Sequence, residues 1–206
     1  MAKNNTQILV GTKNPGKIAE LGELLTDIPV RLRGLNDFPN AIEPEETGAT
    51  FAENAAIKAR SYALQTNLWA LADDSGLEVE ALNNAPGVFS ARYAGLNAAD
   101  TERIKKLLKE LGNTKNKARH ARFVCAMAIA DETGEIKFTA EGVCPGKIAV
   151  KAAGTSGFGY DPIFIPDGFS ETFGELPGDI KQQISHRARA ASEIIQYLRG
   201  IYGSSS

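Results

Sequence analysis

Strand-like and helix-like segments alternate through the first half of this 206-residue chain, which constrains it to an α/β fold. Residues 7–10 form an apolar run, followed by a turn with glycine and proline and then a helix-like stretch. Residues 30–35 and 68–72 predict two further strands, and residues 51–65 predict a helix. A hairpin is predicted across residues 131–134. This mixture favours a mixed central sheet flanked by helices.

The segment ends carry recognisable stop and start signals. Thr50 and Glu53 fit a capping box at the start of the second helix. Gly112 and Asn113 predict a left-handed C-cap for an amphipathic helix that begins near Ala98. In the second half, the sequence predicts a separate strand at 147–150, a short helix opened by 177–179 and a last helix at 185–199.

Composition favours a single domain over residues 1–206, within which two lobes can form. A net charge of −2 argues against a general nucleic-acid partner. The two cysteines lack CxxC spacing and the two histidines lie far apart, so reduced core thiols are expected and zinc is not. No run is long enough for a membrane span, and the polar start at 1–5 is no signal peptide, so we predict a cytoplasmic protein. Residues 203–206 are expected to be a disordered tail.

Two adjacent acids, Asp73 and Asp74, follow the apolar run 68–72, where the third strand is predicted to end. Buried carboxylates are costly unless they are paired, hydrogen-bonded or bound to a cation. One interpretation is a site for Mg²⁺, which can bridge carboxylates and phosphate oxygens. The other is an Asx-type turn in which both acids are solvated. The fragment alone leaves both open.

The first turn, residues 11–17, fits the pattern G-x-x-x-x-G-K between a strand and a helix. Backbone amides, the helix N-terminus and Lys17 would all attract phosphate there. However, Ile18 stands where a P-loop NTPase needs Ser or Thr to bind Mg²⁺, and Pro15 removes one amide. The loop is therefore either a phosphate site of another kind or a plain strand–turn–helix connection.

Seven short motifs occur in one order and together resemble the inosine triphosphatase (RdgB-like) family of pyrophosphatases, over about residues 8–198. They are 12–17 (TKNPGK), 45–48 (EETG), 51–59 (FAENAAIKA), 72–77 (ADDSGL), 87–93 (GVFSARY), 157–162 (GFGYDP) and 185–187 (SHR). The resemblance implies an elongated, two-lobed α/β body with an active-site cleft between the lobes. It also implies a Mg²⁺-dependent homodimer that cleaves the purine nucleotides ITP, dITP and XTP to the monophosphate and pyrophosphate, cleansing the nucleotide pool.

The resemblance also gives roles to charged residues. Asp74 matches the proton acceptor and a metal ligand, and Asp73 is a further metal or orienting carboxylate. Glu45 and Glu46 match the acidic loop of the metal site, with either one pointing inward, and Lys17 and Lys58 would hold the triphosphate and assist catalysis. Without the resemblance, the acidic loop is an ordinary solvated turn and Lys58 an ordinary surface lysine.

Residues expected to contact the substrate lie in five segments. By resemblance, Phe158 stacks on the purine, while His186 and Arg187 face its 6-keto oxygen. The predicted substrate contacts are Thr12, Lys13, Asn14, Pro15, Gly16, Lys17, Ser75, Phe158, Gly159, Tyr160, Asp161, Lys181, His186 and Arg187. From sequence alone, the glycine-rich segment 157–162 is equally a tight turn with a core phenylalanine.

Three other functions stay open at this point. The nearest is a Maf-like nucleotide pyrophosphatase that acts on pyrimidine or modified nucleotides. A P-loop-like nucleotide switch is a second, against which Ile18 argues. A non-enzymatic RNA-binding module is a third, and the lack of a basic stripe argues against it.

Overall fold

The structure is a computed structural model that describes residues 6–26, 28 and 30–203. The N-terminal residues 1–5 and the serines of the expected tail lie outside these described residues. The chain divides into two compact units. The first unit holds the residues up to Asp74, Cys125–Gly142 and the residues from Arg189 onward, and the second holds Ser75–Val124 and Val143–Ala188. Among the described residues, none of the helices has both the length and the apolar character needed to cross a membrane.

One mixed sheet contains all the strands found in the described residues. The strands are β1 (Gln7–Val10), β2 (Arg31–Gly34), β3 (Trp69–Val79), β4 (Ala85–Pro86), β5 (His120–Ala130), β6 (Ile136–Ile148) and β7 (Phe164–Pro166). Their order is β2-β1-β3-β5-β6-β7, and β4 pairs with β3. β1 is parallel to both β2 and β3, whereas β3–β4 and β6–β7 are antiparallel. The predicted mixed α/β sheet is confirmed.

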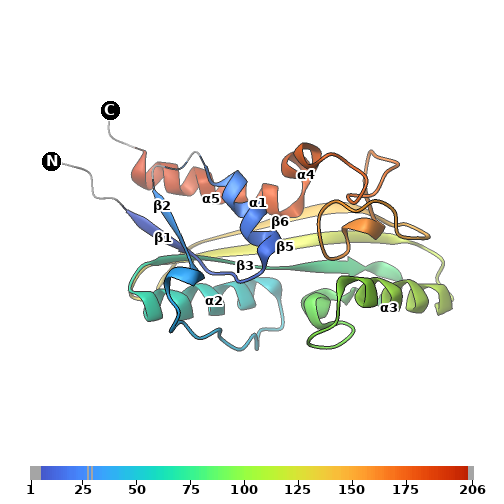
Figure 1. The fold of residues 1–206 in the computed structure, drawn as a ribbon, viewed down its shortest axis with the longest axis horizontal. Coiled ribbons are helices and arrows are strands. Elements are labelled where there is room, and N and C mark those ends of the chain that lie inside the picture. Colours follow the sequence, from blue (N-terminus) through green and yellow to red (C-terminus); the bar gives the residue numbers. More distant parts are fainter. Residues whose placement is uncertain (1–5, 27, 29, 204–206) are drawn as a thin grey trace. The chain divides into compact units, whose positions relative to one another are not determined.

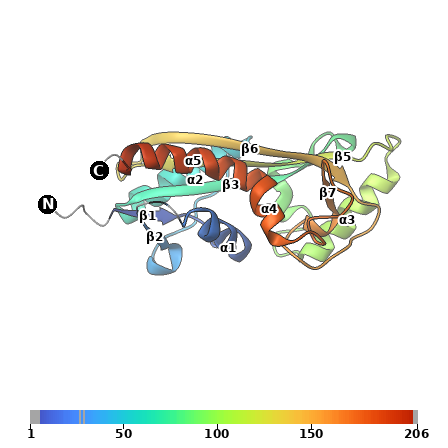
Figure 2. The same ribbon diagram turned by 90° about the horizontal axis from the view of Figure 1, so that it is seen from above.

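In the first unit, helices cover both faces of the sheet. These helices are α1 (Pro15–Leu24), α2 (Phe51–Thr66) and the greater part of α5 (His186–Tyr202). Figure 1 shows α1 and α5 on one side of the strands and α2 on the other. α5 runs along β6 (Figure 2), where Tyr197 stacks on Phe138 with 4.5 Å between ring centroids. Burial of the apolar face of each helix is what holds these layers together. The core on the α1/α5 side consists of Ile8, Leu21, Leu25, Ile28, Leu71, Cys125, Met127, Ile129, Ala140, Ala190, Ala191, Ile194 and Leu198.

The second unit has a separate core. It contains α3 (Asp100–Asn113), α4 (Gly178–Ile184), and the 3₁₀ turns η2 (Glu80–Leu82), η3 (Gly87–Arg92) and η4 (Asp161–Ile163). The amphipathic pattern of α3 predicts an apolar stripe of Ile104, Leu107, Leu108 and Leu111; Leu108 is partly buried and the other three are buried. Those residues pack with aromatic side chains from β5, β7 and the loop before α4, namely Phe123, Phe164 and Phe173.

Several predicted boundaries are confirmed by specific contacts. Thr50 and Glu53 form the expected capping box at the start of α2. The helix predicted to open at 177–179 is α4, and the last helix begins after Ser185, whose hydroxyl accepts the Ala188 amide at 3.1 Å.

The prediction that the third strand ends before Asp73 is wrong. β3 continues through Asp73, Asp74, Ser75 and Gly76 to Val79. Acids usually disfavour a buried strand, but each of these two carboxylates lies against a lysine ammonium, so the strand can keep them in its interior. The acids therefore stand within a strand and not in a turn.

Two further boundaries also differ from the sequence interpretation. The strand predicted at 147–150 is not separate, because β6 runs on through Pro145 and Gly146 to Ile148. The Pro145 carbonyl oxygen accepts the Asp167 amide at 3.0 Å, so this acceptor of β6 is still used at the proline. α3 includes Asn113, and its cap is the extended Thr114 instead of a left-handed residue. The short strand β7 was not predicted, since three residues carry too little alternation to detect.

Candidate active site

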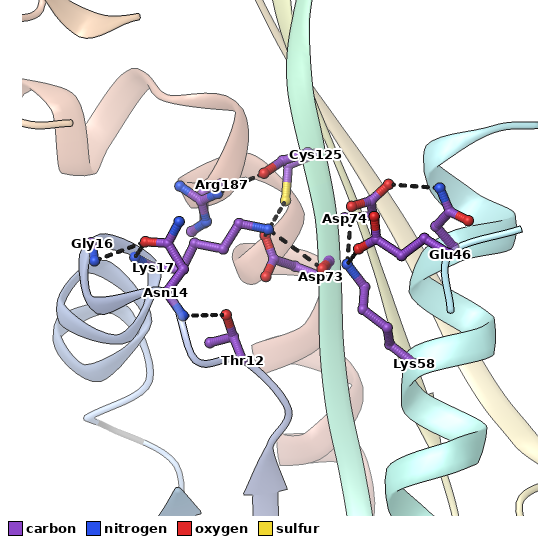
Figure 3. Close-up of polar contacts among 12 residues, drawn as sticks. Thr12, Asn14, Gly16, Lys17, Glu46, Lys58, Asp73, Asp74, Cys125 and Arg187 are labelled. Atoms are coloured by element: carbon purple, nitrogen blue, oxygen red, sulfur yellow. Dashed lines mark hydrogen bonds and ion pairs between the residues drawn. The ribbon is translucent and has the colours of Figure 1, made fainter. Parts of the chain in front are cut away.

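Asp73 and Asp74 point to opposite sides of β3, as neighbouring residues of a strand must. Figure 3 shows Lys17 reaching Asp73 from one side of the strand and Lys58 reaching Asp74 from the other. Together with Glu46, these four side chains make up what we call the acid–lysine cluster, all of it within the first unit. The sheet thus separates two carboxylates that are adjacent in sequence.

On the first side, Asp73 meets a lysine at the start of α1. Lys17 Nζ lies 2.9 Å from Asp73 Oδ2 and 3.5 Å from the Asp73 carbonyl oxygen. The thiol of Cys125, on β5, lies 3.9 Å from the same Oδ2. The Asp73 side chain is fully buried, whereas Lys17 is 13% exposed. The lysine thus has access to solvent while its partner does not.

On the second side, one ammonium holds two carboxylates. Lys58, on α2, places Nζ 2.9 Å from Asp74 Oδ1 and 2.8 Å from Glu46 Oε1. Glu46 comes from the loop before α2, and this contact shows that Glu46 points inward. Glu45, its neighbour, is exposed. Lys58 itself is buried, so it is not the ordinary surface lysine that the sequence pattern alone suggested.

Asn54 is a site residue to which the sequence analysis gave no role. It is fully buried on α2, where its Nδ2 donates to Asp74 Oδ2 at 3.2 Å and its Oδ1 accepts the Gly48 amide at 2.8 Å. A side chain on Gly48 would stand 2.7 Å from that oxygen, so only glycine fits there. Asn54 therefore ties the acidic loop to Asp74. Its position four residues before Lys58, on the same helix face, was the available signal.

The cluster shifts the pKa values of its members. Burial alone would lower the pKa of Lys58, but the carboxylates of Asp74, Asp73 and Glu46 outweigh it and raise that pKa. Burial raises the pKa of Asp74, an effect that the Lys58 ammonium offsets only in part and that Glu46 reinforces. Lys58 is thus firmly protonated, and Asp74 is a stronger base than an exposed aspartate.

The first loop is largely bonded to itself. Asn14 Oδ1 caps α1 by accepting the amides of Gly16 at 2.9 Å and Lys17 at 3.2 Å, and Thr12 Oγ1 accepts the Asn14 amide. Pro15 is the first residue of α1, where a missing N–H costs nothing. Lys13 is exposed and lies 3.9 Å from Glu43. The loop's fixed amides are therefore used for capping, and Lys17 is its mobile positive group.

The donor set of the second side suits a magnesium ion shared with a substrate. Among the described residues, no group of three or more acidic, histidine or cysteine side chains has metal-binding geometry. Mg²⁺ at phosphate-handling sites, however, uses only one or two carboxylates and takes its other ligands from phosphates and water. Glu46 and Asp74 converge on one position and meet that requirement. Asp73 faces the other side of the strand and Glu45 faces solvent, so neither joins this pair.

In the second unit, cationic side chains gather around Phe158. Lys181 Nζ lies 4.8 Å from the Phe158 ring centroid, and the Arg187 guanidinium carbon lies 5.8 Å from it. Lys181 also pairs with Asp161, which accepts the Phe158 amide at 2.8 Å. Gly157 has a φ of +74°, and a side chain on it would stand 2.0 Å from Asp161 Oδ2. Asp161 thereby fixes the loop that presents Phe158.

His186 and Arg187 open α5, as predicted, and both are buried. The His186 imidazole stacks on Phe123 with 4.7 Å between centroids and 12° between planes. Arg187 Nη2 donates to Ser75 Oγ at 2.8 Å. The structure thus brings together five predicted substrate contacts of the second unit, namely Phe158, Asp161, Lys181, Arg187 and Ser75.

Gly159 and Tyr160 have other surroundings. The Gly159 amide donates to Asp100 at the start of α3 at 2.7 Å. The Tyr160 side chain is buried in the core of the second unit, and its hydroxyl donates to the Ser90 carbonyl oxygen at 3.0 Å. Burial raises the pKa of Tyr160, so the hydroxyl stays protonated. These contacts anchor the loop around Phe158.

Comparison with known proteins identifies relatives along almost the whole chain. A dITP/XTP pyrophosphatase of Synechococcus sp. (strain CC9311) is 48% identical over 186 residues, which cover 90% of this chain and 86% of that protein. A second protein of that name, from Nostoc sp. (strain PCC 7120 / SAG 25.82 / UTEX 2576), is 45% identical and covers 97% of both chains.

Solved structures agree in fold. A HAM1 protein from Coxiella burnetii superposes with a TM-score of 0.88 at 44% identity, covering 95% of this chain and 99% of that one. The match to the Ham1 family extends over residues 8–197, which is nearly the span of the seven motifs. The predicted family relationship is confirmed, and the chain belongs to the Ham1 family.

Proposed function

We propose that this protein hydrolyses the non-standard purine nucleotides ITP, dITP and XTP to the monophosphate and pyrophosphate. The observation that carries the reaction type is the acid–lysine cluster, in which Lys17 pairs with Asp73 while Lys58 pairs with both Asp74 and Glu46. The substrate class comes from relatives named dITP/XTP pyrophosphatase that are 41–48% identical over at least 90% of the chain. Removing such nucleotides would cleanse the pool that polymerases use.

In this proposal, Asp74 accepts the proton of the water that attacks the α-phosphorus. A general base works best when its pKa approaches the operating pH, and burial moves Asp74 in that direction. Asn54 donates to one carboxylate oxygen of Asp74 and leaves its orientation fixed. Asp73 acts indirectly, because it positions the ammonium of Lys17.

Positive charge on the departing pyrophosphate is the second requirement of the reaction. Lys17 and Lys58 would supply it, since both are lysines that form ion pairs with the acids of β3 from helices that flank the strand. We propose that Glu46 and Asp74 would hold Mg²⁺, which supplies further charge for the polyphosphate when it is bound. This assignment is narrower than the four acids that the sequence offered.

The purine is proposed to contact the second unit. Phe158 offers a ring for stacking, and His186, Lys181 and Arg187 offer hydrogen-bond donors. Hypoxanthine and xanthine carry a 6-keto acceptor, whereas adenine carries a 6-amino donor that would leave buried donors unpaired. Such a mismatch costs roughly 1–3 kcal/mol for each unsatisfied group, which would disfavour ATP.

Two further expectations follow from the family resemblance and remain proposals. One is a homodimer, which size-exclusion chromatography with light scattering tests directly. The other is a cytoplasmic location, where the nucleotide pool for polymerases lies.

A product assay tests the proposed function. The protein is incubated with Mg²⁺ and ITP, XTP, GTP, ATP or dTTP in turn, and pyrophosphate and orthophosphate are both measured. Pyrophosphate from ITP and XTP, with little from GTP and ATP, is the expected result. Orthophosphate from GTP or ATP would instead indicate a P-loop-like NTPase, and a preference for dTTP a Maf-like pyrophosphatase.

A further inference from the structure

The ammonium group of Lys58 lies between two carboxylates. Its ammonium lies 2.9 Å from Asp74 and 2.8 Å from Glu46, and the side chain is only 7% exposed. The two carboxylates come from different segments, the interior of β3 and the loop before α2. Without a cation between them, the buried carboxylate of Asp74 and the partly exposed carboxylate of Glu46 would repel each other. Lys58 is therefore what allows these carboxylates to converge.

Lys17 provides an internal comparison. It pairs with the carboxylate of Asp73 on the opposite side of the same strand, at the same distance of 2.9 Å. There one ammonium faces one carboxylate, whereas Lys58 faces two. Two carboxylates therefore share the single positive charge of Lys58. A divalent cation at that position would balance both carboxylates, which a lysine cannot do.

We propose that, before nucleotide binds, Lys58 occupies the place of a divalent cation between Glu46 and Asp74, so that lysine and metal compete for the same two carboxylates. This inference rests on the proposed function, because a metal-bound polyphosphate is the substrate that would separate the two competitors. The polyphosphate offers Lys58 new anionic partners, and the carboxylates are then released for the metal. Metal and nucleotide consequently strengthen each other's binding.

Mn²⁺ binding to the nucleotide-free protein tests the competition. The electron paramagnetic resonance signal of free Mn²⁺ is titrated against the wild type, Lys58→Met and Lys17→Met. We expect Lys58→Met to bind Mn²⁺ about tenfold or more tightly than the wild type, because the competing charge has been removed from both carboxylates. Lys17→Met removes the same charge from the opposite side of the strand, and we expect a change of under about threefold.

Two outcomes would overturn the proposal. One is a Lys58→Met protein that binds Mn²⁺ no more tightly than the wild type. The other is an equal gain in Lys17→Met, which would indicate a general charge effect. Adding Glu46→Gln to Lys58→Met should abolish the gain, which ties the metal to this carboxylate pair.

Folding and function are checked separately from the competition. Circular dichroism confirms that each variant is folded, and Lys58→Gln, which keeps one donor, replaces Lys58→Met if the latter unfolds. Hydrolysis of ITP by the wild type tests the proposed function by itself. A wild type that cleaves ITP while Lys58→Met shows no gain in Mn²⁺ affinity defeats only the competition. A gain without ITP cleavage defeats only the proposed substrate.

Discussion

Asp73 and Asp74 are the same residue type and adjacent in sequence, but the two sides of β3 give them different surroundings. On one side, Asp73 is fully buried and faces Lys17 and the Cys125 thiol. On the other, Asp74 shares Lys58 with Glu46 and is fixed by Asn54. The first arrangement pairs one ammonium with one carboxylate, whereas in the second one ammonium is shared by two carboxylates. Identical neighbours thus acquire different chemistry because a strand sends them to different surroundings.

The largest effect should come from exchanging each acid for its amide. Asp74→Asn removes the proposed base, and we expect turnover of ITP to fall by about 10³-fold with the fold retained. Asp73→Asn weakens the positioning of Lys17, so the expected loss is at least about tenfold smaller and falls mainly on KM. Steady-state kinetics and circular dichroism of both variants decide the point. Equal losses in kcat would show that the two sides act as one unit.

A smaller difference is expected between the neutral partners of the acids. Asn54→Ala removes the amide that orients Asp74 and leaves a buried cavity, and turnover should fall by about tenfold. Cys125→Ala removes a weak sulfur contact to Asp73, and turnover should change by less than about threefold. The kinetic constants for ITP provide the measurement. A greater loss for Cys125→Ala would reverse the proposed ranking of the two sides.

The pH dependence sharpens the role of Asp74. Burial raises its pKa, so the base form is lost on acidification at a higher pH than an ordinary aspartate would show. The acid limb of kcat/KM should therefore lie above the ordinary pKa of an aspartate side chain. The linked effect on stability has the opposite sign, because protonation of Asp74 favours the folded state that holds the proton more tightly.

The melting temperature provides the matching control. As the pH falls through the raised pKa, the wild type should gain stability relative to Asp74→Asn, which has no carboxyl to protonate there. An acid limb that coincides with relative loss of wild-type stability would mean that unfolding, and not the base, limits activity.

The smallest effects should come from removing the N-caps of α1 and α2, the two helices that carry the lysines. Asn14→Ala and Thr50→Ala each remove a side-chain cap and should cost about 1 kcal/mol of unfolding free energy. Lys17 lies in the first turn of α1, whereas Lys58 lies two turns into α2. Only Asn14→Ala should therefore raise KM as well. Urea melts and ITP kinetics measure both, and an equal change in KM would contradict this reasoning.

The sequence predicts the sheet class and most helices, because capping residues and apolar periodicity are local signals. Thr50 with Glu53 and the stripe on α3 are examples. The sequence does not predict that β3 runs through two aspartates. The two lysines that stabilise these aspartates, Lys17 and Lys58, are distant from them in sequence. Long-range pairing of this kind overrides local propensity.

The sequence predicted most of the residues of the candidate site but not how they are placed relative to one another. The motifs named both acids, both lysines and the pair Glu45 and Glu46, but they did not show that a strand sends Asp73 and Asp74 to opposite sides. The role of Asn54 was missed because an asparagine on a helix face has no distinctive pattern, and its two contacts exist only after folding.

Placing reactive acids inside a strand also limits how this chain can change. The register of β1 with β3, in which Leu9 pairs with Ala70, fixes the side to which every later residue of β3 points. Inserting or deleting one residue between Ala70 and Asp73 would exchange the partners of both acids at once. Length variation should therefore be confined to the loops, and this strand should accept substitutions but no indels.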